Sequence, residues 1–301
     1  MMIEASHLTV KYGTLKAVDD FDFIVDRGEI LALVGPDGAG KTSIFRAVCN
    51  LINFEKGEVR IAGYDHVREF DRIKPHLGYM PQAFSLYPDL SVEENMKFYA
   101  GLFGLDRHIL ESRMEKLYSF SGLGPFARRR AGALSGGMKQ KLALSCNLVH
   151  DPEVLLLDEP TTGVDPLSRR QFWSILKDLR ESGSAIVVST PYMDEVELAD
   201  RAIFIHKGRK LAEGTPRELT AMFRGYVYLV EMVPSSEYMS RLNSLDGSYA
   251  RRFGSSIHLY TDDEQSADNL AERLNAIDLK PTGIKQINPE LEDVFIQLMG
   301  S

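Results

Sequence analysis

A glycine-rich segment near the N-terminus has the residue types and spacing that hold a chain of phosphates. It reads GPDGAGKTS and satisfies the pattern G-x-x-x-x-G-K-S/T. The glycines let successive backbone N–H groups curl around phosphates, and the N-terminus of a following helix adds positive potential. We expect Lys41 to reach the terminal phosphates and the Thr42 hydroxyl to hold Mg²⁺. The expected phosphate-binding residues are Gly35, Pro36, Asp37, Gly38, Ala39, Gly40, Lys41, Thr42 and Ser43.

A second segment, VLLLDEP, supplies two adjacent carboxylates after an apolar run. We expect Asp158 to hold the magnesium shell and Glu159 to polarise the attacking water, which are the minimum requirements for hydrolysis of a triphosphate. The alternative is a pair of solvated acids at the start of a loop. That alternative loses force in a chain that also carries a phosphate loop.

The elements that must position these residues follow an alternating strand and helix order. The apolar run EILALV (29–34) precedes the glycine-rich segment, and the helix-like TSIFRAVCNLI follows it. Similar apolar runs lie at 154–158 and 185–189, and strands this apolar are covered on both faces of a parallel sheet. Residues 3–10 and 21–25 alternate apolar and polar side chains, which predicts antiparallel strands exposed on one side. The sequence therefore predicts an α/β core.

Two further regions are predicted from their patterns. Residues 85–150 are helix-like, with Ser91 and Glu94 as a capping box before the apolar stripe Met96, Tyr99 and Phe103. After about residue 224 the order becomes strand, helix, two strands, helix, strand and helix, which is typical of a small α+β domain of ferredoxin-like type. We therefore predict domains at 1–222 and 223–301, with a helical subdomain at about 85–150.

Composition narrows the class of protein. The chain has 301 residues and a formal net charge of -8, which gives no support to nucleic-acid binding. Its two cysteines, Cys49 and Cys146, each lie in an apolar, helix-like stretch, so we expect no disulfide and a reducing compartment. The opening residues do not form a signal peptide, and no later run reaches the ~18 apolar residues of a membrane span. We expect a cytoplasmic protein.

The order of the motifs resembles that of a known family. The phosphate loop, LGYMPQ, LSGGM (134–138), LLLDEP and GVDP resemble the nucleotide-binding domains of ABC transporters over about residues 3–214. The resemblance implies a P-loop NTPase of ABC type, with a mixed core sheet, an antiparallel β subdomain and an inserted helical subdomain. In that family the serine and glycines of LSGGM contact ATP held by the opposite subunit of a head-to-tail dimer. The matching residues here are Ser135, Gly136 and Gly137.

The resemblance assigns two more roles. Gln82 matches the glutamine that reaches the magnesium and the attacking water and links the core to the helical subdomain. Tyr12 matches the aromatic residue that stacks on adenine. The alternatives are a simple loop amide for Gln82 and an edge-strand aromatic for Tyr12.

The particular residues of these motifs are similar to those of exporters of the ABC type 2 class, and within that class to those of YbhF-type ATPases. The implied protein is an ATP-hydrolysing subunit that powers export through separate membrane-spanning permease subunits and pairs with a second ATP-binding subunit. It would then be peripheral on the inner face of the cell membrane. A different class, ABC ATPases that act on ribosomes or DNA, normally has tandem cassettes, a basic linker or a long coiled coil, and none of these is evident in the sequence.

Two positions depart from the family pattern. Met138 replaces the usual glutamine at the end of LSGGM, and Pro191 stands where the family has a histidine that contacts the γ-phosphate. We expect Thr190 to cap a helix that starts at Pro191, so that the fold is unaffected. We hypothesise slow hydrolysis at this site, and the alternative function is a nucleotide-binding regulatory subunit with little hydrolysis of its own.

Overall fold

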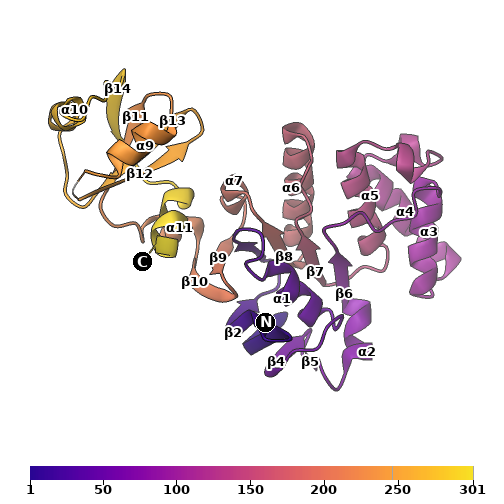
Figure 1. The fold of residues 1–301 in the computed structure, drawn as a ribbon. Coiled ribbons are helices and arrows are strands. Elements are labelled where there is room, and N and C mark those ends of the chain that lie inside the picture. The colour runs from indigo at the N-terminus through magenta and orange to yellow at the C-terminus, as the bar shows by residue number, and fades with distance from the viewer. Residues whose placement is uncertain (246, 301) are drawn as a thin grey trace. The chain divides into compact units, whose positions relative to one another are not determined.

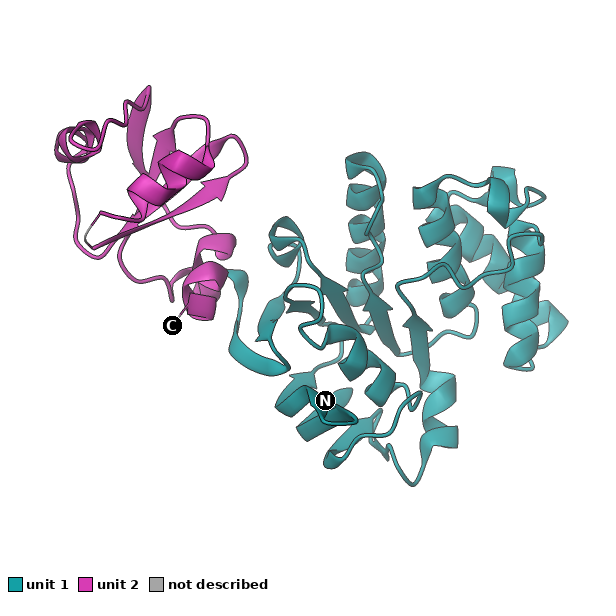
Figure 2. Cartoon of the chain, viewed as in Figure 1, with its two compact units in different colours: residues 1–216 teal, residues 217–301 magenta. Residues whose placement is uncertain are grey.

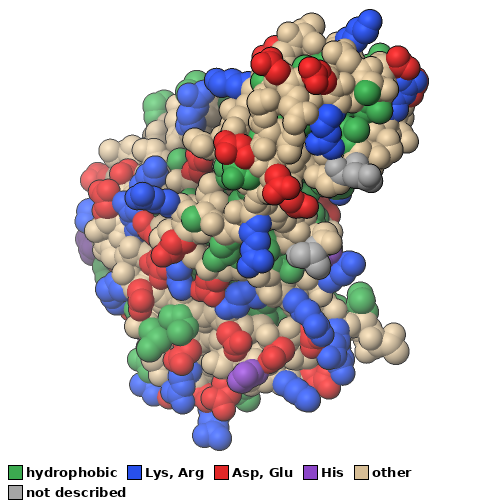
Figure 3. Space-filling model, turned by 90° about the vertical axis from the view of Figure 1, so that its left-hand side faces the viewer, with side chains coloured by type: hydrophobic (Ala, Val, Ile, Leu, Met, Phe, Trp, Pro, Cys, Tyr) green, Lys and Arg blue, Asp and Glu red, His purple; other side chains and the backbone are tan. Residues whose placement is uncertain are grey.

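The computed structural model describes residues 1–245 and 247–300, which form two compact units, Met1–Pro216 and Arg217–Ser301 (Figure 2). The sequence predicted a boundary after residue 222. On the face drawn in Figure 3, acidic and basic side chains are interspersed. Among the described residues, no helix combines the length and the apolar character that crossing a bilayer requires.

An antiparallel sheet opens the first unit (Figure 1). Its strands run in the order β2-β1-β4-β5, and the predicted antiparallel pairing of the first two is present. Inward-facing side chains alternate along β1 until His7, whose φ of 54° marks a bulge that shifts the register by one residue. The strand bounds are β1 (Ile3–Tyr12), β2 (Leu15–Val25), β4 (Lys56–Ile61) and β5 (Tyr64–Asp65).

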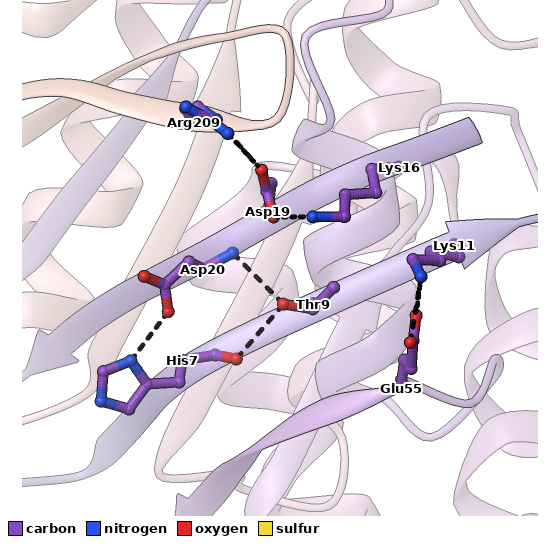
Figure 4. Close-up of polar contacts among 8 residues, drawn as sticks. All are labelled: His7, Thr9, Lys11, Lys16, Asp19, Asp20, Glu55 and Arg209. Carbon is purple, nitrogen blue, oxygen red and sulfur yellow. Dashed lines mark hydrogen bonds and ion pairs between the residues drawn. The ribbon is translucent and has the colours of Figure 1, made fainter. Parts of the chain in front are cut away.

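Polar contacts fix this sheet near its bulge (Figure 4). The His7 ring lies 2.8 Å from Asp20, and the Thr9 hydroxyl accepts a hydrogen bond from the Asp20 amide. Asp19 of β2 pairs with Arg209 of β10 at 2.6 Å. This last pair ties the antiparallel sheet to the core sheet beside the phosphate loop.

The core sheet has six strands in the order β10-β9-β3-β8-β7-β6. The three predicted buried strands, β3, β8 and β7, are its parallel centre, and every residue in them is buried. The flanking strands β6, β9 and β10 were not predicted, and β10 runs antiparallel to β9. The bounds are β3 (Ile30–Val34), β6 (Leu77–Met80), β7 (Val154–Asp158), β8 (Ala185–Thr190), β9 (Arg201–His206) and β10 (Arg209–Gly214).

Helices cover the core sheet. The apolar side of α1 packs in one hydrophobic cluster with side chains of both sheets, while α6 packs on β3 and β8. Asp165 caps α6 and Pro166 opens it, and Gly183 follows the helix with a φ of 98°. The bounds in the first unit are α1 (Lys41–Val48), α2 (Phe70–Ile73), η1 (Lys74–His76), α6 (Pro166–Glu181) and α7 (Met193–Val196). The short helix α8 (Pro216–Thr220) spans the boundary between the two units.

The predicted helical region contains three α-helices and two short 3-10 helices between β6 and β7. Ser91 and Glu94 form the predicted capping box, with bonds of 3.1 and 2.7 Å. Of the predicted stripe, Met96 is buried, Tyr99 is half-buried and Phe103 is exposed while stacking on the ring of His150. The bounds are α3 (Val92–Leu102), α4 (Arg107–Ser121), η2 (Gly124–Phe126), η3 (Ala131–Ala133) and α5 (Gly136–Leu148).

The second unit has the predicted ferredoxin-like order. Its four strands are antiparallel in the order β12-β13-β11-β14, and α9 and α10 contribute to one hydrophobic core with one face of the sheet. The last helix, α11, contacts the other face through Asp293. The bounds are β11 (Tyr226–Glu231), α9 (Ser236–Leu242), β12 (Ser248–Phe253), β13 (Ser256–Thr261), α10 (Ala267–Asn275), β14 (Gly283–Ile287) and α11 (Leu291–Gly300).

Candidate nucleotide site

The phosphate loop connects the buried strand β3 to the N-terminus of α1, as its sequence predicts. Gly40 is the N-cap residue, with a φ of 113°. A Cβ at this position would also lie 2.4 Å from the carbonyl oxygen of Ala17 on β2, so only glycine fits. The backbone of the β9–β10 turn braces the loop, because the Gly208 amide donates to Ala39 and the Gly208 carbonyl accepts from Asp19. The loop therefore presents a fixed helix N-terminus of the kind that binds phosphate.

A cavity of about 360 Å³ lies against this loop. Tyr12, Gln82 and Glu159 come from three distant parts of the chain and share its lining, which agrees with their grouping in the sequence analysis. Tyr12, at the end of β1, is 45% exposed, and its hydroxyl accepts a hydrogen bond of 3.5 Å from Ser43. The full lining is Tyr12, Leu15, Ala17, Asp37, Gly38, Ala39, Gly40, Lys41, Thr42, Ser43, Gln82 and Glu159.

Lys41 and Glu159 form a buried ion pair at the bottom of the cavity. Their charged atoms lie 3.2 Å apart, and the two side chains are 4% and 6% exposed. The Lys41 ammonium also donates to the carbonyl oxygens of Gly35 and Pro36, at 2.7 and 3.2 Å. A buried ammonium with such short-range partners is held in place where a phosphate chain would pass.

The Glu159 carboxylate is further positioned by two neutral donors. Gln82 donates to it at 2.8 Å and the Thr162 hydroxyl at 3.3 Å. Its backbone has a φ of 48°, and its amide donates to Ser189, so the residue sits in a constrained turn at the end of β7. Gln82 therefore contacts Glu159 directly, and together they place an amide and a carboxylate at the cavity wall.

Asp158 has the features of a cation ligand. One of its oxygens accepts from the Ser189 hydroxyl at 2.6 Å, while its buried Oδ2 has no hydrogen-bond partner within the described residues. Burial raises the pKa of Asp158 and the Glu159 charge adds to this, while the hydroxyls of Ser189 and Thr42 and the charge of Lys41 act in the opposite direction. The Asp158 carboxylate and the nearby Thr42 hydroxyl fit Mg²⁺, which takes one or two protein oxygens together with substrate phosphates. The described residues contain no cluster of three metal-ligating side chains.

The residues of LSGGM lie outside this cavity. Ser135 is the N-cap of α5 and accepts from the Met138 amide at 3.4 Å; both Ser135 and Gly136 are exposed. Gly137 is buried, and a Cβ there would lie 2.5 Å from the Ser168 side chain of α6. Close packing of α5 on α6 thus requires this glycine, while the first residues of α5 remain exposed.

The segment around Pro191 differs from the prediction. Pro191 does not open a helix, because α7 begins at Met193 with Tyr192 as its N-cap. Thr190 is the last residue of β8, and its hydroxyl accepts from the Tyr192 amide and donates to Glu195. The expected helix start is therefore wrong, since Thr190 closes a turn between the strand and α7.

Two residues that the sequence did not predict, Glu195 and Ser189, hold the acidic segment in place through hydrogen bonds. Buried Glu195 accepts hydrogen bonds of 2.6 Å from Thr161, close after Glu159, and from Thr190 at the end of β8. Ser189 connects the same two strands through Asp158 and the Glu159 amide. The position of Ser189, at the end of an apolar run and facing the acidic pair, was the available signal.

Comparisons with known proteins agree with this arrangement. A family model described as ABC transporter matches residues 18–162. The multidrug ABC transporter ATP-binding protein YbhF of Escherichia coli, a name given as probable, is 42% identical over 73% of this chain, which spans 38% of that protein. The Nod factor export ATP-binding protein I of Rhizobium etli is 34% identical, with 99% of this chain and 93% of that protein covered.

Solved structures give the same fold. An ATP binding subunit of an ABC transporter is 28% identical, with a TM-score of 0.68, over 74% of this chain and 93% of that one. The dimeric, post-hydrolysis cassette MJ0796 with ADP and Pi has a TM-score of 0.64 over 71% of this chain and 98% of its own, at 24% identity. The predicted fold class is confirmed, and this chain belongs to the family of ABC transporter ATP-binding proteins.

Proposed function

We propose that this chain binds and hydrolyses MgATP and that it couples the reaction to export through separate membrane-spanning subunits. The observation that carries the proposal is the convergence of Lys41, Gln82 and Glu159 on one cavity at the phosphate loop. Two relatives are named for multidrug transport and for Nod factor export, which supports the exporter class. The chain covers under two fifths of the first of these, so its cargo and partners are part of the proposal.

Within the cavity each residue has a distinct task. Tyr12 offers a ring for the adenine base, and Lys41 binds the terminal phosphates with the backbone of the loop. Glu159 holds a water for in-line attack and accepts its proton, while Gln82 orients both. Asp158 and Thr42 would hold Mg²⁺, which when bound neutralises charge on the phosphate oxygens.

The exposed start of α5 completes a second chain's site in this proposal. Ser135 and Gly136 lie outside the cavity that contains Lys41, and a helix N-terminus with small residues can approach a polyanion closely. In the proposed arrangement two cassettes pair head to tail, and the start of α5 in each one contacts the ATP bound to the other. The permease subunits would take up the motion of the helical region through the loop of Gln82.

Replacing Lys41 with alanine is expected to weaken MgATP binding to the full chain by at least about tenfold, because charge-assisted bonds to phosphate are lost. Titration calorimetry measures this directly. Lys56→Ala, which removes an exposed lysine from β4, is the matched control and should bind as the parent does. Tyr12→Leu provides a second variant at an exposed position, and it too should bind more weakly. Parental affinity in both Lys41→Ala and Tyr12→Leu would place the nucleotide elsewhere.

A further inference from the structure

The second compact unit contains a cavity of about 510 Å³, which is in the size range of small-molecule sites. It lies on the sheet face opposite the core that α9 and α10 help to form, because Tyr249 and Tyr260 alternate with the core residues Ala250 and Leu259 along their strands. Its other wall is α11, which contributes Ile296, Gln297 and Met299. All of its lining residues fall between 223 and 300, so the cavity belongs to this unit alone.

A buried polar cluster fixes the floor of the cavity. Asp293, at 0% exposure, accepts hydrogen bonds of 2.8 Å from His258 and Tyr260 and one of 2.7 Å from the Glu290 amide. Burial alone would raise the pKa of Asp293, but these three hydrogen bonds outweigh it and hold the pKa below its usual value. The ring of Phe253 stacks on His258 at 4.0 Å. The first turn of α11 is therefore fastened to β13, which holds this side of the cavity in place.

Three aromatic side chains, those of Phe223, Tyr249 and Tyr260, contribute to the wall. Tyr249 and Tyr260 stack with their centroids 5.8 Å apart and an interplanar angle of 22°, and Phe223 lies 6.0 Å from Tyr260. Tyr249 is 40% exposed, so its ring is accessible from the cavity. Such a wall can stack a flat ring by offset or edge-to-face contact.

The lining of the cavity holds two guanidiniums that can pair with an anion. The guanidinium of Arg251 lies over the Tyr249 ring, 5.1 Å from its centroid. Neither Arg251 nor Arg224 has a carboxylate within ion-pair distance anywhere in residues 1–245 and 247–300. The lining also holds two acidic side chains, Asp262 and Asp293. Both oxygens of Asp293 already accept hydrogen bonds, from His258, Tyr260 and the Glu290 amide, which leaves Asp262 as the acid with no cationic partner among the described residues. Gln297 holds the backbone of Arg224 with two hydrogen bonds, at 2.9 and 2.7 Å.

We propose that this cavity is a binding site for a small organic anion that carries a flat ring, separate from the nucleotide site of the first unit. The ring stacks against Tyr249, and the anionic group pairs with the guanidiniums of Arg251 and Arg224. The hydrogen bonds between Gln297 and the Arg224 backbone, and those between Asp293 and β13, hold α11 in place against the rest of the site. The site depends on none of the residues assigned to ATP.

Anilinonaphthalene sulfonate, a fluorescent aromatic anion, tests the site on the full chain. Arg251→Ala should weaken its binding about tenfold, whereas Arg252→Ala should leave it nearly unchanged. Arg252 is the matched control because it is exposed, adjacent in β12 and absent from the lining, so both variants lose the same charge. Equal effects of the two arginine variants, including no effect of either, would overturn the proposal. Tyr249→Leu should also weaken binding, and parental affinity in that variant would overturn the role of the ring.

Displacement of the same probe identifies the kind of anion. Adenosine monophosphate and indole acetate represent ring-bearing phosphates and carboxylates, and methyl phosphate and acetate are their ringless counterparts. The proposal predicts that at least one ring-bearing anion displaces the Arg251-dependent signal at lower concentration than its ringless counterpart. Whichever of adenosine monophosphate and indole acetate displaces the probe at the lower concentration shows whether the site prefers a phosphate or a carboxylate. Equal displacement by the ringless anions, or displacement by none, would contradict a site of this class.

Discussion

ATP hydrolysis by the Glu159→Gln variant is expected to fall by about a hundredfold to ten-thousandfold, which is the usual contribution of a general base. Glutamine keeps the shape of the side chain but cannot accept a proton from water, and it ends the 3.2 Å ion pair with Lys41. MgATP affinity should change much less, because the proposal assigns binding to the phosphate loop. A phosphate-release assay and a binding titration on the same preparation separate the two effects.

Glu197→Gln is the control for this experiment, since it removes an exposed carboxylate that lies after α7. That variant should hydrolyse ATP as the parent does. If Glu159→Gln also retained parental hydrolysis, Glu159 would not be the base, and the cavity would be a binding site without catalysis of its own.

The Pro191→His variant is expected to hydrolyse ATP roughly a hundredfold faster than the parent, the magnitude typical of one donor to transition-state charge in a dry site. Pro191 follows β8 directly and lies two residues beyond Ser189, which contacts both Asp158 and Glu159. Proline offers neither a side-chain donor nor a backbone N–H. Because α7 begins only at Met193, histidine should be accommodated without loss of fold.

Pro191→Ala distinguishes the imidazole from the backbone. It restores the N–H without a ring, and it should leave hydrolysis near the parental rate. A histidine variant no faster than the alanine variant would show that the missing side chain does not limit turnover. The hypothesis of slow hydrolysis at this site would then be wrong.

The parts of the fold that were predictable depend on local signals. The phosphate loop is specified by glycines whose neighbours leave no space for a Cβ, as at Gly40, and the three central strands by unbroken apolar runs. The capping box at Ser91 and the Asp165 cap likewise involve residues close together in the chain. The motif order then brought Tyr12, Gln82 and the acidic pair into one hypothesis.

The parts that were missed depend on contacts between distant residues. The sequence MDEVE holds several acids, and only the hydroxyls of Thr161 and Thr190 decide that Glu195 is the buried one. The Thr190 hydroxyl bonds to the Tyr192 amide and to Glu195, and α7 begins at Met193 and not at Pro191. Strands such as β6 and β9 acquire their places from pairing with β7 and β3, which no local pattern specifies.

The most direct measurement is a structure of the Glu159→Gln chain with MgATP, in complex with the proposed membrane subunits and second ATP-binding cassette. The account predicts a triphosphate that touches Lys41 of this chain and the start of the other cassette's α5 counterpart. In the same assembly, Ser135 of this chain should contact the other nucleotide. Ser135 facing solvent, far from any bound ATP, would contradict a shared site between two cassettes.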